Sequence, residues 1–292
     1  MGSIDGQGQI VDNGGNHMPQ FHHWGLTLSS SPISHADASY EKRAIAFLDI
    51  LGFSDLIKEG GHEREIGQIF DQLKIRAAQA ERHHGKGRMQ FTAFSDCIVV
   101  SEEFLDGFGA LRIASYAGYL ALELLGYGFL VRGGLTVGDL YHREGVVFGP
   151  AMNEAYNLES KIAVYPRLVV TESFRASAFQ GVLAEVDGQT DHMRVQWTMS
   201  QYRSDFDGVT HYDIFHPLAP TPDRFISMGG GKGTSNEIRG RASIAAVRNV
   251  RQLRFKDAVA QKYNWMDNYL AVSVKQYGWQ RLLEEADAPP VS

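Results

Sequence analysis

The first strong structural signal in the chain is a run of apolar residues at positions 44–50, interrupted only by Asp49. The run passes into the sequence Leu-Gly-Phe-Ser, which is typical of a tight turn. After a pair of glycines, apolar residues recur every three or four positions over residues 66–84. A continuous apolar run of this length predicts a buried strand, and the longer period predicts an amphipathic helix. We therefore expect a strand, followed by a helix that covers one face of a sheet.

Strand and helix signals alternate in the same way up to residue 171. The expected strands lie at residues 89–94, 97–100, 129–137, 140–148 and 167–171. The expected helices lie at residues 105–125 and 151–163. The order of elements is β-α-β-β-α-β with an appended helix and strand, which is typical of an α+β fold with a ferredoxin-like sheet.

The pattern is weaker in the C-terminal part of the chain. Apolar and polar residues alternate over residues 193–199, which predicts a strand paired with residues 211–215 in a hairpin. Residues 239–270 have an apolar side and an arginine-rich side, which predicts one long helix.

Three regions follow from these signals. Residues 1–40 are rich in Gly, Ser, His and Asn and have no apolar stretch after a basic start, so we expect a flexible leader rather than an export signal. Residues 41–178 are expected to form the core. Residues 179–292 are expected to form a hairpin and helical extension of the same domain.

Composition excludes several classes of protein. The 292 residues include 28 Lys and Arg against 34 Asp and Glu, a formal net charge of −6, which disfavours a nucleic-acid partner. The single cysteine, Cys97, excludes an intramolecular disulfide framework and fits a reducing compartment, so the cytoplasm is the expected location. The most apolar stretch, residues 116–131, contains Glu123 and is shorter than the roughly 18 residues of a membrane span. We expect no membrane segment.

Two acidic residues stand at the ends of neighbouring predicted strands. Asp49 ends the first strand, and Asp96 lies at the bend between the next two. In a ferredoxin-like sheet the strands that carry them are antiparallel neighbours, so the two carboxylates are expected to converge. Carboxylate oxygens suit Mg²⁺ or Mn²⁺. Taken alone, an acid after an apolar strand is more often a cap or turn residue.

Four ordered segments resemble motifs of the class III nucleotidyl cyclases. They are Phe-Leu-Asp-Ile-Leu-Gly-Phe-Ser at residues 47–54, Phe-Ser-Asp at 94–96, Arg-Gly-Gly-Leu-Thr-Val-Gly at 132–138 and Phe-Gly-Pro-Ala-Met-Asn-Glu-Ala-Tyr-Asn-Leu-Glu at 148–159. The likeness spans residues 43–171, although Ser95 stands where the family usually has a glycine. It implies a metal-dependent cyclase that acts as a homodimer with composite active sites.

The resemblance implies roles for individual residues. Asp49 and Asp96 would hold two Mg²⁺ or Mn²⁺ ions, with the carbonyl oxygen of Ile50 as a further ligand. The backbone of the turn would cradle phosphate groups, and its residues are Gly52, Phe53 and Ser54.

The helix after the second glycine-rich segment would complete the partner's site. Asn153 matches the family's asparagine that orients the ribose, but Asn157 stands where the family has an arginine that steadies charge on the α-phosphate. A cation from elsewhere would replace that arginine, with Lys161 as the first candidate and Arg132 as the second.

The two base-selecting positions implied by the resemblance are Thr92 and Val146, which match neither the adenine pair nor the guanine pair. These departures, with Tyr-Pro-Arg at residues 165–167 and Lys-Tyr-Asn-Trp at 262–265, resemble the pyrimidine nucleotide cyclases of the bacterial Pycsar antiphage systems. That resemblance implies a cyclic UMP or cyclic CMP product read by a separate downstream effector. Thr92 can donate or accept a hydrogen bond, so it does not separate UTP from CTP.

Two other functions stay open on the sequence. One is a purine nucleotide cyclase with an unusual base pocket. The other is a catalytically inactive cyclase-like module that binds a nucleotide, and Asn157 in place of arginine favours it.

Overall fold

The apolar run at residues 44–50 forms the middle of β3 (Glu41–Leu51), which lies inside an eight-stranded sheet. Side chains alternate between the two faces of a strand. On β3, Ala44, Ala46 and Leu48 belong to one buried cluster, and Ile45 and Phe47 belong to another. Both faces of this strand are therefore covered, which explains why its sequence is apolar almost without interruption.

The computed structural model describes residues 3–4, 10–11, 39–84, 89–104, 108–184, 191–254 and 256–288. The chain divides into two compact units, Met1–Ala38 and Ser39–Ser292. The described part of the first unit is one antiparallel pair, β1 (Ser3–Ile4) with β2 (Ile10–Val11). Most of the leader expected over residues 1–40 lies outside the described residues. The boundaries at residues 178 and 179 stay a prediction.

The strand order confirms the ferredoxin-like plan. β4 (Met89–Phe94), β5 (Cys97–Glu103), β3 and β6 (Leu130–Arg143) lie side by side in that order, and each adjacent pair is antiparallel. The sheet continues from β6 through three short strands, β8 (Leu168–Val170), β10 (Thr210–Tyr212) and β9 (Tyr202–Ser204). β6 and β8 are parallel, and β7 (Val146–Phe148) pairs with the end of β6.

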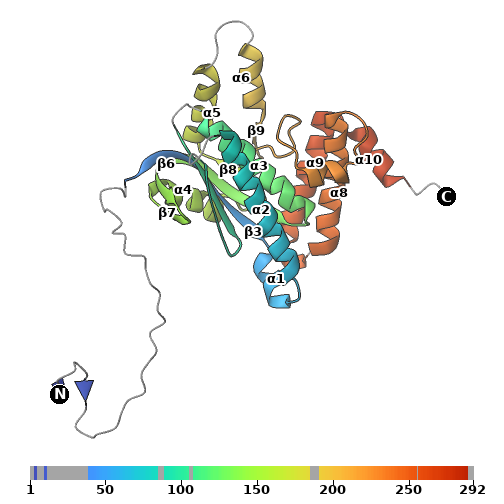
Figure 1. The fold of residues 1–292 in the computed structure, drawn as a ribbon. Coiled ribbons are helices and arrows are strands. Elements are labelled where there is room, and N and C mark those ends of the chain that lie inside the picture. Colours follow the sequence, from blue (N-terminus) through green and yellow to red (C-terminus); the bar gives the residue numbers. More distant parts are fainter. Residues whose placement is uncertain are drawn as a thin grey trace. The chain divides into compact units, whose positions relative to one another are not determined.

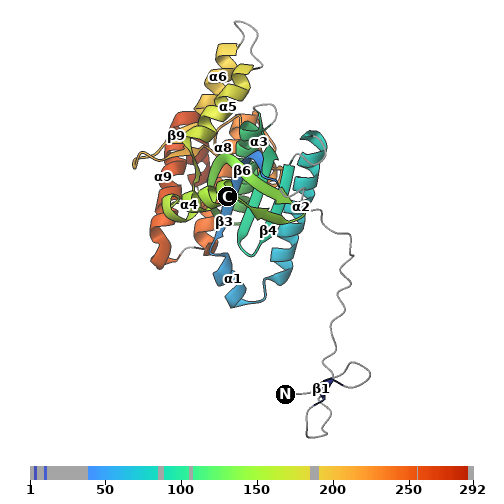
Figure 2. The same cartoon turned by 90° about the vertical axis from the view of Figure 1, so that its left-hand side faces the viewer.

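Helices cover the two faces of the sheet unequally. α2 (Glu63–His84) contacts β4, and α3 (Gly109–Gly126) contacts β3, β5 and β6 (Figure 1). On the opposite face, α4 (Pro150–Asn157) contacts β3 and β6 (Figure 2) and continues into a π-helix, Leu158–Ile162. Gly134 of β6 permits this close approach, because a Cβ there would lie 2.5 Å from the Cβ of Leu158.

Two predicted strands are a single strand. β6 runs without a break from Leu130 to Arg143, so the strands expected at residues 129–137 and 140–148 are continuous through Gly138, and only β7 is separate. A glycine in a strand permits a bend without ending the strand, and the sequence alone did not distinguish the two outcomes.

The strand predicted at residues 193–199 is wrong. These residues lie in α6 (Asp191–Ser200), where Trp197 is exposed and Thr198 is buried. The alternation therefore marked no buried strand face, since a period-two pattern over a few residues carries little information without a partner strand. A hairpin does exist, but its strands are β9 and β10, with Tyr202 opposite Tyr212.

The long helix predicted at residues 239–270 is also wrong. The chain forms α8 (Ser235–Arg254), a 3₁₀ turn (Asp257–Val259) and α9 (Ala260–Tyr277), followed by α10 (Gln280–Asp287). α8 and α9 pack against each other (Figure 1). Doubling back lets both helices bury apolar side chains in one core, which a single straight helix would leave exposed.

The remaining helices join these parts. They are α1 (Phe53–Glu59), α5 (Glu172–Ala184) and α7 (Asp223–Met228). Within the described residues, no helix is both long enough and apolar enough to span a bilayer.

Candidate active site

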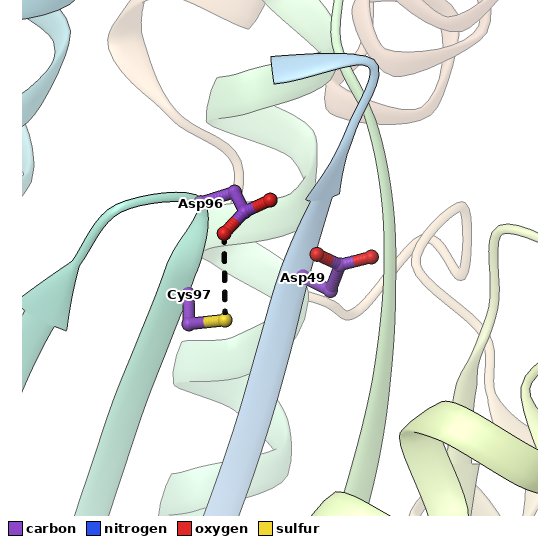
Figure 3. Close-up of side chains that lie close together, drawn as sticks. All are labelled: Asp49, Asp96 and Cys97. Atoms are coloured by element: carbon purple, nitrogen blue, oxygen red, sulfur yellow. Dashed lines mark hydrogen bonds between the residues drawn. The ribbon is translucent and has the colours of Figure 1, made fainter. Parts of the chain in front are cut away.

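Asp49 and Asp96 lie close together at one end of the sheet (Figure 3). Asp49 stands opposite Cys97 in the β3–β5 register, and the backbone N–H of Ile50 donates to the carbonyl oxygen of Asp96 at 2.9 Å. One carboxylate oxygen of each Asp and the Sγ of Cys97 lie within 4.8 Å of one another. A single cation placed among these atoms would therefore reach both carboxylates.

The turn that carries Asp96 has an unusual backbone. Ser95 and Asp96 join β4 to β5, and Ser95 adopts a φ of 53°, in the left-handed region. Two-residue hairpin turns favour positive φ, which glycine adopts without strain. This geometry gives a physical reason for the glycine that the cyclases usually have at this position, and the structure shows that Ser95 also forms the turn.

An arginine bridges Asp49 to a third acid. Arg132 faces Asp49 across β3 and β6, and its Nε lies 2.9 Å from Asp49 Oδ2 and 2.7 Å from Glu159 Oε1. Glu159 belongs to the π-helix, and its side chain is only 4% exposed. Burial raises the pKa of Glu159 to about 7, with Arg132 opposing the shift and the charges of Asp49 and Asp96 adding to it.

The chemistry of the donor atoms fits a hard cation. Burial, together with the nearby charges of Asp96 and Asp49, raises the pKa of the Cys97 thiol to about 12. In the metal-free chain the sulfur is therefore protonated at neutral pH. The preference of a hard cation for oxygen favours the two carboxylates as the donors. Carboxylate oxygens at rigid strand ends suit Mg²⁺ or Mn²⁺ better than soft metals.

The C-terminal part of the chain brings lysines to the same end of the sheet. A cavity of about 230 Å³ is lined by the turn residues Gly52 and Ser54 and by Lys256 and Lys262. Lys256 forms ion pairs with Asp55 and Glu59, at 3.0 Å and 3.5 Å.

Lys262 interacts electrostatically with Asp49 and Glu159. Burial and the charge of Arg132 lower the pKa of Lys262, while the charges of Asp49 and Glu159 act in the opposite direction. The sequence offered no signal that this lysine of α9 approaches Asp49, because its placement depends on how distant segments pack.

The residues expected to complete a partner's site lie elsewhere. Asn153, Asn157 and Lys161 together line a cavity of about 670 Å³, which also includes Lys42 and Asp139. Neither Asp49 nor Asp96 lines this cavity. Within one chain, the structure therefore brings the two acids together and the two asparagines together, but on separate surfaces.

The two positions expected to select the base lie on two different strands, β4 and β7. Thr92 is half-buried on β4, and its Oγ1 lies 2.9 Å from Nε2 of His142. Val146 begins β7 and is 54% exposed. Neither residue lines the two cavities described above.

Comparison with known proteins gives a weak structural likeness. No protein-family model and no curated protein matches the chain. The adenylyl cyclase CyaB from P. aeruginosa is 15% identical with a TM-score of 0.36, over 47% of this chain and 80% of that chain. An adenylate/guanylate cyclase/hydrolase from Silicibacter pomeroyi is 18% identical with a TM-score of 0.36, over 64% of this chain and 99% of that chain. At these values the likeness carries no argument about substrate or reaction.

The raised pKa of Glu159 predicts a pH-dependent gain from Glu159→Gln. Between about pH 4.5 and 7 the folded chain holds a proton on Glu159 that the unfolded chain releases, so wild-type stability falls as the pH rises through this window. The glutamine variant does not titrate there. We expect it to be more stable than wild type by about 3 kcal/mol at pH 8 and nearly equal at pH 4.

Urea unfolding of both proteins from pH 4 to 8, in buffer without divalent metal, measures the difference. Glu284→Gln, at an exposed position of α10, is the control and is expected to show no such pH dependence. A Glu159→Gln variant that is less stable than wild type at pH 8 would contradict the assignment.

Proposed function

We propose that the protein is a metal-dependent nucleotidyl cyclase that converts a pyrimidine nucleoside triphosphate to its 3′,5′-cyclic nucleotide and pyrophosphate. The observation that carries the proposal is the approach of Asp49 and Asp96, whose ligand atoms lie within 4.8 Å of each other. They lie beside a Gly-Phe-Ser turn in a ferredoxin-like sheet, in segments that resemble the class III cyclase motifs. We favour UTP over CTP.

In this proposal each chain supplies oxygen ligands and orienting groups. Asp49, Asp96 and the carbonyl oxygen of Ile50 would hold two Mg²⁺ or Mn²⁺ ions, which when bound lower the pKa of the ribose 3′-hydroxyl and neutralise triphosphate charge. Asn153 would orient the ribose so that its 3′-oxygen faces the α-phosphorus. The 3′-hydroxyl loses its proton to water, and its oxygen bonds to the α-phosphorus while the bond from the α-phosphorus to the bridging oxygen breaks and pyrophosphate leaves.

Asn157 stands where the cyclase family has an arginine, so another cation is needed at the α-phosphate. Arg132 already forms ion pairs with Asp49 and Glu159, so its charge is engaged at the metal end. Lys161 lies in the cavity with the asparagines. We add Lys262 as a third candidate, because it lines the cavity beside Gly52 and is coupled to the charge of Asp49.

We propose a homodimer with two composite sites, each taking its acids from one chain and Asn153 from the other. Large apolar side chains are exposed around α4, β7 and the β4–β5 turn, namely Phe94, Val146, Phe148, Tyr156, Ile162 and Val164. Tyr156 is 51% exposed while its ring packs edge to face on Phe47 at 5.6 Å. A second chain that covers this surface would remove it from water.

The finer assignments rest on the sequence resemblance to the Pycsar cyclases. They are the choice of a pyrimidine through Thr92 and Val146, a role in antiphage signalling, and a separate effector that reads the product. An inactive nucleotide-binding module is the second candidate, and Asn157 favours it.

The first test is turnover of UTP, CTP, ATP and GTP, each supplied separately with Mg²⁺ or Mn²⁺. We expect a cyclic pyrimidine nucleotide, and a loss of at least about a hundredfold in kcat for Asp49→Asn and Asp96→Asn, because each removes a ligand charge. Asp71→Asn, at an exposed position of α2, is the matched control and should keep wild-type activity.

Three outcomes would redirect the proposal. Product from ATP or GTP alone would replace a pyrimidine cyclase by a purine cyclase. Tight nucleotide binding without pyrophosphate release would support the inactive module. Normal turnover by either Asp variant would refute the metal assignment.

A second test addresses the composite sites by mixing variants that are inactive alone. Asp49→Asn chains mixed with Asn153→Ala chains form heterodimers with one intact site, so random pairing should restore about a quarter of wild-type activity. A mixture of Asp49→Asn with Asp96→Asn is the control, because both changes fall on the same half of the site and no intact site forms. Equal activity in the two mixtures would rule out shared sites.

A third test asks which cation acts at the α-phosphate. We expect Lys262→Met to lower kcat by about ten- to a hundredfold, since removal of one oriented charge-stabilising donor commonly has an effect of this size or larger. Lys161→Met tests the rival candidate. Lys275→Met, exposed near the end of the same helix as Lys262, is the control. If kcat falls only in Lys161→Met, Lys262 is not the missing cation.

A further inference from the structure

Arg132 has two acidic neighbours, but only one of them receives its Nε–H. The nitrogen lies 2.9 Å from Asp49 Oδ2 and 2.7 Å from Glu159 Oε1. A guanidinium Nε carries a single hydrogen, and here that hydrogen is donated to Asp49. Glu159 Oε1 is buried, and among the described residues it accepts no hydrogen bond. One hydrogen thus lies between two acceptors, and the acceptor that is buried more deeply stays unsatisfied, which is costly.

The backbone fixes the position of Glu159. The residue belongs to the π-helix Leu158–Ile162, which lies against β6. Gly134 stands two residues after Arg132 on the same side of β6, and a Cβ there would lie 3.0 Å from the backbone nitrogen of Glu159. The side chain of Glu159 is 4% exposed, whereas that of Arg132 is 23% exposed. A change of partner would therefore move the arginine rather than the acid.

The contact between Arg132 and Asp49 opposes cation binding at the same carboxylate. In the proposed function Asp49 and Asp96 hold divalent cations. A guanidinium that donates to Asp49 Oδ2 uses one lone pair of that oxygen, and its positive charge repels a cation placed beside it. Transfer of the Nε–H to Glu159 removes this conflict. It also leaves the guanidinium with a carboxylate partner and gives the buried oxygen a donor.

We propose that Glu159 is a positioning residue that takes over the Nε–H of Arg132 when a divalent cation binds Asp49. The inference rests on the proposed function, in which Asp49 is a metal ligand. The two acids exchange partners, since Asp49 gives up the arginine for the cation and Glu159 gains the arginine. The affinity of the site for the cation therefore depends on an acid that is not itself a ligand.

The test compares Mn²⁺ binding by two neutral replacements of Glu159. Glu159→Gln and Glu159→Met both remove the negative charge, so their general electrostatic effect on the cation is the same. Only glutamine keeps an oxygen that can accept from Arg132. Electron paramagnetic resonance measures free Mn²⁺ in a titration at pH 8 without nucleotide. We expect Glu159→Met to bind Mn²⁺ about tenfold more weakly than Glu159→Gln, because a charged donor has lost its alternative acceptor.

The same two substitutions in an Arg132→Met background are the control. Without the guanidinium, an oxygen at position 159 has no hydrogen to accept, so the two double variants should bind Mn²⁺ equally. The titration gives the number of sites separately from their affinity. A lower folded fraction therefore reduces the number of sites and leaves the measured affinity unchanged.

Two results would overturn the inference and leave the proposed function standing. One is equal Mn²⁺ affinity in Glu159→Gln and Glu159→Met, and the other is a difference of the same size in the Arg132→Met background. If wild type shows no saturable Mn²⁺ binding, or if Asp49→Asn binds Mn²⁺ as tightly as wild type, the metal assignment of the proposed function fails. The inference about Glu159 then fails with it.

Discussion

The register of β3 between β5 and β6 is the constraint on which the site depends. It places Asp49 opposite Cys97 on one side and opposite Arg132 on the other. A slip of one residue would turn Asp49 toward the face that α3 covers, among Leu48 and Ile50, where an unpaired charge is costly. The apolar alternation along β3 therefore does more than form a core, because it fixes the side of the sheet on which the acids meet. The antiparallel β4–β5 turn then brings Asp96 to the same end.

Charge balance at that end follows from the same pairing. Three carboxylates, Asp49, Asp96 and Glu159, lie near one another, and like charges at short range oppose ionisation. Arg132 contacts two of them and offsets part of the repulsion. Burial is the main cause of the raised pKa of Glu159, and the charges of Asp49 and Asp96 add to it. Arg132 alone does not balance the carboxylates of Asp49 and Asp96, and a divalent cation bound between them would neutralise the remaining charge.

The sequence predicted what local periodicity and neighbouring strands determine, and it failed where long-range packing decides. The strand at residues 44–50, the helix at 66–84 and the ferredoxin-like order all follow from patterns within short windows, and so does the approach of Asp49 to Asp96. The segment at residues 193–199 gave a period-two pattern too short to distinguish a strand from a helix. His142 gave no signal either, because its partners come from β4 and β5 and are brought together only when the sheet forms.

The break in the predicted C-terminal helix connects the fold to the site. If residues 239–270 formed one straight helix, Lys262 would lie about 12 Å beyond Arg254 along the axis, at 1.5 Å per residue. Instead the chain turns at Asp257–Val259, and α9 returns along α8, so that Lys262 and Lys256 line the same cavity as Gly52 and Ser54. The extension is therefore part of the surroundings of the acidic pair. Its folding and the electrostatics at Asp49 are coupled, because loss of α9 would remove a positive charge that opposes the repulsion among the carboxylates.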